Sequence, residues 1–151
     1  MKESLKHLKR GDTSYPERRD PSLLDTFSNP RRGRIYEIRF FTREVTSLCP
    51  VTGQPDFYRV EITYIPEERC LESKSLKLYL FSLRNTGIFA EELANTVLED
   101  LVAACSPRWM RVVCRMNPRG GIALTVVAEY GRRPDHLGQE PCGGQGDHAE
   151  Q

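Results

Sequence analysis

Two stretches in the first half of the chain alternate between apolar and other residues. Residues 36–41 place a tyrosine, an isoleucine and a phenylalanine on one face, and residues 58–64 repeat this period of two. Pro66 then ends the second stretch, because proline has no N–H to donate to a sheet. Alternation of this kind is typical of a half-buried strand. The pattern predicts two strands joined by a turn over residues 46–57.

The period changes to three and four residues in the middle of the chain. Residues 76–83 carry apolar residues at this spacing, and the Asn-Thr-Gly of residues 85–87 ends the stretch. A longer stripe follows and finishes before Pro107. Its members are Phe89, Leu93, Val97, Leu101 and Ala104. The spacing predicts two amphipathic helices.

Two further alternating stretches follow, over residues 110–116 and 122–128. Between them, residues 117–121 read Asn-Pro-Arg-Gly-Gly, a composition typical of a tight hairpin turn. The order of elements is therefore β-β-α-α-β-β, which predicts an α+β fold. Two helices can cover only one face of a four-stranded antiparallel sheet.

The uncovered face of this sheet would carry apolar side chains among polar ones: Phe41, Trp109, Val113 and Val127. Copies of the same chain readily complete a small sheet of this kind, because edge-to-edge pairing removes its bare edges. The sequence therefore predicts a homo-oligomer.

The two ends of the chain are poor in apolar residues. Residues 1–33 and 131–151 are predicted to be a flexible N-terminal arm and a flexible C-terminal tail, and residues 34–130 to form one folded domain. No apolar run approaches the ~20 residues that a membrane span needs, and the first residues do not resemble a signal peptide. We expect a soluble cytoplasmic protein with no membrane partner.

Composition and histidine placement narrow the possible chemistry. Five cysteines without a Cys-x-x-Cys pair argue against a disulfide framework and a zinc knuckle, and a formal net charge of +1 gives no case for direct nucleic-acid binding. All histidines, His7, His136 and His148, lie in the two ends. A Cys/His nucleophile pair or a catalytic zinc is therefore disfavoured, and no metal is expected. If the core is catalytic, a carboxylate is its natural proton carrier.

Cys49 and Asp56 are the natural pair for such chemistry. The residues between them include two prolines and a glycine, which can fold the chain so that both side chains face one cleft. An acid beside the thiol could accept its proton and later return it. The alternative is that Cys49 is a structural cysteine, and for Cys105 and Cys114, at apolar-face positions, burial is the natural interpretation. Cys70 and Cys142 lie in a loop or the tail.

Several charged residues could bind an anionic or guanine-like ligand. Lys74 and Lys77 share a helix face and could hold phosphates, with Ser73 nearby, although a solvated lysine face explains the same spacing. Arg119 could add a cation at the hairpin tip. Glu91, in the first turn of the second helix, suits either the helix dipole or the paired N–H edge of a guanine-type base. There is no strand-GxGxxG-helix unit for a dinucleotide.

Four motifs in order, TSLCPVTGQPDF (46–57), ESKSLKLYL (72–80), RNTGIFAE (84–91) and PRGGI (118–122), give the chain a family resemblance. Together they resemble the single-module QueF nitrile reductases, which reduce 7-cyano-7-deazaguanine to 7-aminomethyl-7-deazaguanine with NADPH on the route to queuosine in tRNA. The resemblance implies a T-fold (tunnelling fold), with subunits joined into β-barrels and active sites between subunits. It implies a homodecamer of two stacked pentamers.

Carried over by position, the resemblance implies roles for individual residues. Cys49 matches the nucleophile that forms a covalent thioimide, and Asp56 matches the acid/base that protonates nitrogen. Glu72, Ser73 and Glu91 match residues that bind the deazaguanine. Lys74 and Lys77 fall in the motif that the family uses for NADPH, and the resemblance makes Arg119 a plausible further phosphate contact.

Two positions depart from the family pattern. Ala90 stands where members often carry a histidine, and Leu93 stands where some carry a second cysteine that can pair with the nucleophile. The alternatives are the related amidinotransferase branch, which acts on nitrile-bearing tRNA and lacks the ESKSLK-type motif, and a T-fold protein that binds a deazapurine without turnover.

Overall fold

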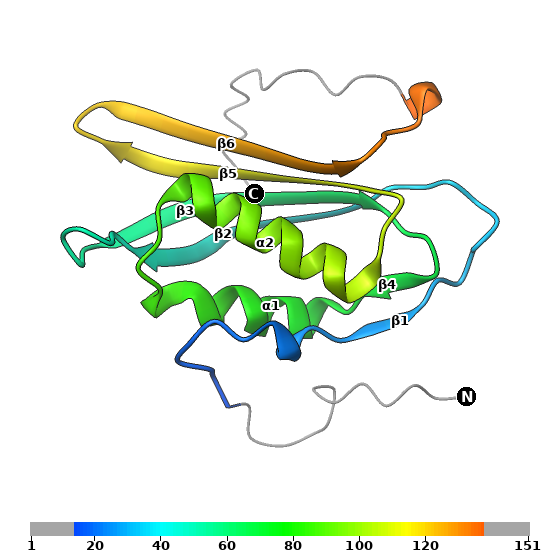
Figure 1. Ribbon diagram of the computed structural model, residues 1–151, viewed down its shortest axis with the longest axis horizontal. Coiled ribbons are helices and arrows are strands. Elements are labelled where there is room, and N and C mark those ends of the chain that lie inside the picture. The colour runs from blue at the N-terminus through cyan, green and yellow to red at the C-terminus, as the bar shows by residue number, and fades with distance from the viewer. Residues whose placement is uncertain (1–13, 138–151) are drawn as a thin grey trace, which may run out of the picture.

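The centre of the protein is an antiparallel sheet of four strands, in a computed structural model that describes residues 14–137. The strands are β2 (Ile38–Leu48), β3 (Pro55–Ile65), β5 (Trp109–Arg119) and β6 (Ile122–Gly131). They lie in the order β2-β3-β5-β6, so that two hairpins stand side by side (Figure 1). The four predicted strands are confirmed.

Two α-helices cover one face of this sheet (Figure 1). Helix α1 (Ser73–Phe81) continues into the short 3-10 helix η2 (Ser82–Asn85), and α2 (Ala90–Cys105) follows. The core lies between the helices and the sheet, and both layers supply its largest buried side chains. These include Tyr58, Tyr64, Tyr79, Leu93, Leu101 and Met110. The predicted α+β fold is confirmed.

The hairpin between β5 and β6 turns through Gly120 and Gly121, whose φ angles are 58° and 77°. Only glycine adopts this left-handed region without steric cost at both positions of a two-residue turn. The hairpin expected over residues 117–121 is confirmed, and it is tighter than expected because β5 extends as far as Arg119.

The N-terminal side of the core is more ordered than the sequence suggested. Residues 20–28 contain the 3-10 helix η1 (Pro21–Leu23) and strand β1 (Thr26–Ser28), which pairs with β4 (Arg69–Leu71) in a second, two-stranded sheet. The division of the chain into 1–33, 34–130 and 131–151 stays a prediction. Within residues 20–28, the backbone N–H groups of Asp20 and Asp25 donate to the side chains of Ser82 and Ser75 in the core.

A polar contact anchors the chain just before this segment, in addition to the packing of Leu23 and Leu24 against the core. Arg19 donates two hydrogen bonds to the buried carboxylate of Asp100 in α2, at 2.6 and 2.9 Å, and Tyr79 of α1 donates a third at 2.5 Å. A charge buried at this depth is costly unless it is paired and hydrogen-bonded. An apolar pattern does not show such an anchor, which explains why the sequence-based prediction missed it.

Residues after β6 also contact the sheet. The guanidinium of Arg133 lies 5.1 Å from the ring centroid of Trp109 and forms an ion pair with Glu37 at 2.6 Å. Trp109 is therefore only 1% exposed, although the sequence placed it on an open face. The short helix η3 (Asp135–Leu137) ends the described part.

The outer face of the sheet is mixed in character. The ion pair between Arg115 and Glu61 crosses it at 2.9 Å, while Phe41 and Val127 stay exposed, as expected. Among residues 14–137, no strand pairs with the outer edges of β2 and β6. Two strand edges and part of an apolar face are thus open in the single chain.

Candidate active site

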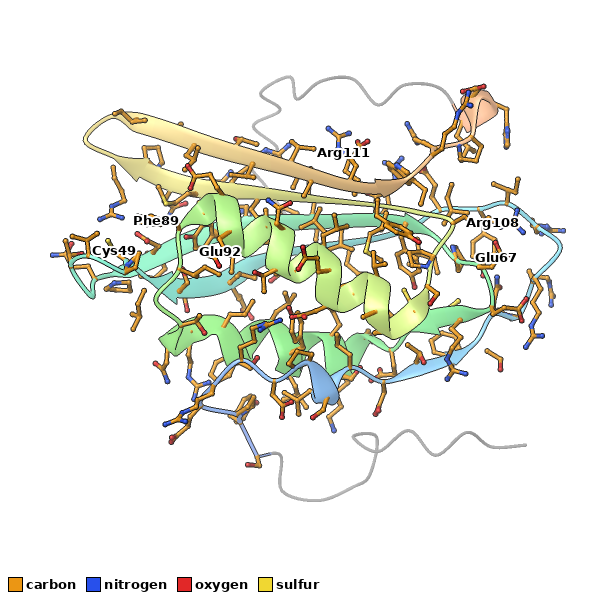
Figure 2. All side chains as sticks on the ribbon, viewed as in Figure 1. Cys49, Glu67, Phe89, Glu92, Arg108 and Arg111 are labelled. Atoms are coloured by element: carbon orange, nitrogen blue, oxygen red, sulfur yellow. The ribbon has the colours of Figure 1, made fainter. Side chains whose placement is uncertain are left out.

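Cys49 lies at the start of the turn between β2 and β3, at one end of the molecule (Figure 2). Its backbone N–H donates to Gln54 at 2.7 Å, and its carbonyl accepts from Gly53 at 2.9 Å. Gly53 has a φ of +70°, which favours glycine. These bonds close the chain on itself, and the half-buried thiol lies at the turn's entrance.

An irregularity in β2 decides the face on which Cys49 falls. Thr42 pairs with Val60 and Val45 pairs with Tyr58, so β2 has one residue more than β3 between these pairs. A one-residue bulge moves every later side chain of the strand to the opposite face. Ser47 is consequently buried against the core, and Cys49, two residues further on, continues the same alternation.

The turn favours the charged form of the thiol. Hydrogen bonds from the Thr52 side chain, and from the backbone N–H groups of Thr52 and Val51, lower the pKa of Cys49 to about 7, and Arg119 adds a smaller contribution. Burial alone has the opposite effect, and it raises the pKa of Cys105 and of Cys114 to about 12. The pKa of Cys70, the fourth described cysteine, is also raised by burial. Because thiolate is the nucleophile, Cys49 is the candidate nucleophile among these four.

Asp56 lies on β3 opposite Ser47, and only 5% of it is exposed. Arg119, near the tip of the β5–β6 hairpin, donates from Nη1 to its Oδ1 at 2.6 Å. Arg119 also affects the Cys49 thiol, so it lies close to both residues. That Cys49 and Asp56 face one cleft stays a prediction. We call Cys49, Asp56 and Arg119 the thiol cluster.

The start of α2 lies beside the thiol. Leu48 donates to the carbonyl of Thr86 at 2.9 Å and accepts from Ile88 at 3.0 Å, forming a short parallel bridge. Phe89 is the N-cap residue of α2, and its side chain cannot form a capping hydrogen bond. It lies at the same end of the molecule as Cys49 (Figure 2). The exposed Glu91 is in the first turn of this helix. The uncapped helix start therefore leaves backbone N–H groups of α2 without a side-chain partner at this end of the molecule.

Glu72 has a structural contact that the sequence analysis missed. Its carboxylate caps α1 by accepting from the N–H groups of Lys74 at 2.7 Å and Ser75 at 2.8 Å, and only 6% of it is exposed. Each carboxylate oxygen has a second lone pair, so the cap leaves acceptor capacity for a ligand. We call Glu72, Ser73, Lys74 and Lys77 the helix-start cluster.

A cavity of about 430 Å³ lies between α1 and strands β2 and β3. Its polar lining residues include Ser73, Thr42, Glu44 and Lys77. Its aromatic lining comes from Tyr15, Phe40, Phe41 and Phe81. Tyr15 packs edge-on against Phe81, with ring centroids 4.9 Å apart. This mixture of flat apolar walls and a few polar groups is typical of a small-molecule site.

The two clusters lie at opposite ends of α1. Helix α1 begins next to β4 and ends on the side of the β2–β3 turn (Figure 1), where Figure 2 labels Cys49. Glu72 and Ser73 are at the start of this nine-residue helix, away from that turn. Neither Cys49 nor Asp56 lines the cavity. The predicted site residues therefore form two separate groups.

Several smaller expectations have an outcome. The loop expected around Cys70 is wrong: Cys70 is buried in β4, with its Sγ 3.8 Å from the Tyr36 hydroxyl. His136 is exposed in η3, and the other two histidines and Cys142 lie outside the described residues. Residues 14–137 contain no cluster of three or more His, Cys, Asp or Glu side chains suited to a metal ion. None of their helices has the length and apolarity required to cross a membrane.

Comparisons with known proteins agree with these motifs. The family model described as QueF-like protein matches residues 55–135. The NADPH-dependent 7-cyano-7-deazaguanine reductase of Anaeromyxobacter sp. (strain K) is 52% identical over 74% of this chain and 91% of that protein. The reductase of the same name from Syntrophus aciditrophicus (strain SB) is 55% identical over 71% of this chain and 76% of that protein.

A solved structure extends the likeness to three dimensions. The archaeosine synthase QueF-Like in the apo form is 34% identical, with a TM-score of 0.60 over 65% of this chain and 96% of that one. The expected T-fold module is confirmed by this match together with the observed sheet and helices. The chain belongs to the QueF family.

Proposed function

We propose that this protein is an NADPH-dependent 7-cyano-7-deazaguanine reductase, which converts the nitrile to the primary amine 7-aminomethyl-7-deazaguanine in queuosine biosynthesis. Relatives more than 50% identical carry the name of this reductase. The structural observation that carries the proposal is the thiol cluster. The pKa of Cys49 is lowered to about 7, and Arg119, which contributes to this shift, also holds the buried carboxylate of Asp56.

The first step is the addition of the Cys49 thiolate to the nitrile carbon. As the S–C bond forms, one π bond of the nitrile breaks, and the nitrogen takes a proton to give a neutral thioimide. Asp56 is the proton carrier for this nitrogen, because its pairing with Ser47 on the neighbouring strand places it at the root of the Cys49 turn. The histidine that many members carry is here Ala90, which is buried in the core, so Asp56 carries the protons without it.

The helix-start cluster and Glu91 are assigned to binding. The carboxylates of Glu72 and Glu91 suit the paired N–H donors of a guanine-type base, and the hydroxyl of Ser73 adds a polar contact. NADPH, when bound, supplies the two hydrides that reduce the carbon. The residues fit this cofactor: Lys77 lines a cavity with aromatic walls, where its ammonium can hold a phosphate, and Lys74 lies one turn away on α1.

The separation of the two clusters supports an assembled site. Sheet edges on β2 and β6 are open, and pairing them between subunits would close a barrel. We infer a homodecamer of two stacked pentamers in which the thiol cluster of one subunit meets the helix-start cluster of another. A thiol nucleophile works in a reducing compartment, so the cytoplasm is its expected location. No membrane or nucleic-acid contact is part of the proposal.

A second candidate is the amidinotransferase activity on nitrile-bearing tRNA. It is favoured by the likeness to the archaeosine synthase QueF-Like, which is 34% identical. The same thiol addition would begin both reactions. The motif with Lys74 and Lys77 supports the reductase instead, because a transferase has no use for phosphate contacts to a hydride donor.

A stoichiometry measurement separates these functions. Purified protein is mixed with the nitrile and excess NADPH, and the loss of NADPH absorbance is compared with the amount of amine formed. A reductase consumes two NADPH per nitrile, whereas a transferase or a binding protein consumes none. Cys114→Ala is the matched cysteine control, because this thiol is fully buried and should not affect turnover.

A further inference from the structure

Arg119 occupies an unexpected place in the structure. The resemblance made it a plausible contact for the cofactor, yet its Nη1 lies 2.6 Å from Oδ1 of Asp56. Asp56 is 5% exposed, whereas the Arg119 side chain is 44% exposed. A buried carboxylate is costly without a partner, and a guanidinium is well suited to supply one.

A bulge in β5 produces this contact. Met116 pairs with Leu124 and Arg119 pairs with Ile122, so β5 carries one residue more than β6 between these pairs. In regular pairing, residue 118 would share the face of Met116. The extra residue gives that place to Arg119 instead, because one inserted residue exchanges the two faces of a strand. Met116 lies directly opposite Tyr58, whose face also carries Asp56.

The contact with Arg119 uses only one of the two carboxylate oxygens of Asp56. Among residues 14–137, the recorded hydrogen bond to the Asp56 side chain comes from Arg119 and reaches Oδ1. Oδ2 is left for a proton or a substrate. Arg119 also contributes to lowering the pKa of Cys49, after the larger effects of Thr52 and Val51. The other charged or titratable groups around this turn are Tyr58 on β3 and the first-turn carboxylates of α2.

We propose that Arg119 is a positioning residue of the reaction: it clamps Oδ1 of Asp56, so that Oδ2 carries the proton between the Cys49 thiol and the nitrile nitrogen. The thiol proton moves to Oδ2 as the thiolate forms, and it passes to the nitrile nitrogen as the S–C bond forms and one π bond of the nitrile breaks; Arg119 keeps its own protons throughout. The role rests on the proposed nitrile chemistry. The Arg119–Asp56 contact itself does not depend on that chemistry and can be tested separately.

The test compares Arg119→Gln, Arg119→Lys and the control Arg115→Gln. Arg115 lies on the same strand but pairs with Glu61 on the outer face, away from the thiol cluster. The first readout is the rate of Cys49 alkylation by iodoacetamide against pH, followed on the Cys49 peptide by mass spectrometry in the full chain without nitrile or NADPH. The second is kcat and KM for NADPH in the nitrile assay.

We expect Arg119→Gln to raise the alkylation midpoint and to slow alkylation about threefold or more near neutral pH, because the charge of Asp56 is no longer balanced beside the thiol. It should lower kcat at least about tenfold and leave KM for NADPH within about twofold. Arg119→Lys should recover part of both effects because it keeps the charge, and Arg115→Gln should change neither.

An unchanged alkylation profile in Arg119→Gln, together with a raised KM for NADPH, would overturn the proposal and make Arg119 a cofactor contact. Thermal unfolding of each variant shows whether the hairpin still folds, and Arg119→Lys keeps the test decisive if Arg119→Gln does not. If the protein does not reduce the nitrile at all, the proposed function fails, but the alkylation readout still decides whether Arg119 acts on the thiol cluster.

Discussion

The thiol cluster and the helix-start cluster contain two carboxylates that are buried almost equally, Asp56 at 5% and Glu72 at 6% exposed. Their partners differ. A single arginine from an exposed hairpin tip holds Asp56, whereas two backbone N–H groups of α1 hold Glu72. Backbone donors belong to the helix and cannot leave, but a guanidinium on a hairpin can shift. Under the proposed function, this difference suits the thiol cluster to proton movement and the helix-start cluster to fixed recognition.

Replacing Asp56 by asparagine is the strongest way to sharpen this contrast. The amide cannot carry the proton, so kcat should fall about a hundredfold to ten-thousandfold, the usual contribution of a general acid or base. Rapid mixing with the nitrile should show a slower addition of sulfur, because Asp56 carries the proton of this step, while alkylation of Cys49 by iodoacetamide shows that the thiol itself remains. A fall in kcat of less than about threefold would remove Asp56 from the mechanism.

Two inactive variants should together recover activity if the clusters meet between subunits. Cys49→Ala removes the nucleophile from the thiol cluster. Glu72→Gln removes a carboxylate that would bind the deazaguanine from the helix-start cluster. Co-expression of the two should restore about a quarter of the sites in a randomly mixed ring, since each site draws one cluster from each of two subunits. Activity that stays at the level of the separate variants would mean that both clusters serve one subunit.

Lys77→Ala should weaken the binding of NADPH without affecting the addition of sulfur to the nitrile. Lys77 is exposed at the cavity, and alanine is a good helix former, so the fold should tolerate the change. Loss of one phosphate contact should raise KM for NADPH about tenfold, equivalent to ~1.4 kcal/mol of binding free energy. The rate of sulfur addition to the nitrile is the internal control and should not change.

The smallest effect is on stability. Glu72→Ala removes the cap of α1 and should lower the free energy of unfolding by about 1 kcal/mol, or up to about 2. Cys49→Ala, in an open turn, should leave it almost unchanged. Urea denaturation of both variants measures the free energy of unfolding. An equal decrease of this free energy in the two variants would contradict the view that Glu72 is a structural cap.

The sequence predicted the architecture well because alternation and helical periodicity follow burial directly. The strands around Tyr58 and Val112, the helix stripe through Leu93 and the glycine turn at Gly120 were all visible as patterns. The turn between β2 and β3 followed from the prolines and the glycine between Cys49 and Asp56. The local sequence pattern therefore reveals which residues are buried, and with them the strands and helices of the scaffold.

The missed features share a physical cause, because each depends on one extra residue or on a polar contact distant in sequence. The bulges before Cys49 and Arg119 exchange strand faces, and alternation carried through them assigns later residues wrongly. The contact between Arg19 and Asp100 spans 81 positions. A periodic pattern of apolar residues does not show contacts between polar residues distant in the sequence. Pro118, which has no N–H, was a signal for irregular pairing in β5.

The central claim is that Cys49 attacks the nitrile carbon. The direct measurement mixes the protein with the nitrile in the absence of NADPH and follows the absorbance band of the thioimide. We predict a band in the unaltered protein and in Cys114→Ala, and none in Cys49→Ala. Absence of the band from the unaltered protein, or its persistence in Cys49→Ala, would contradict the account.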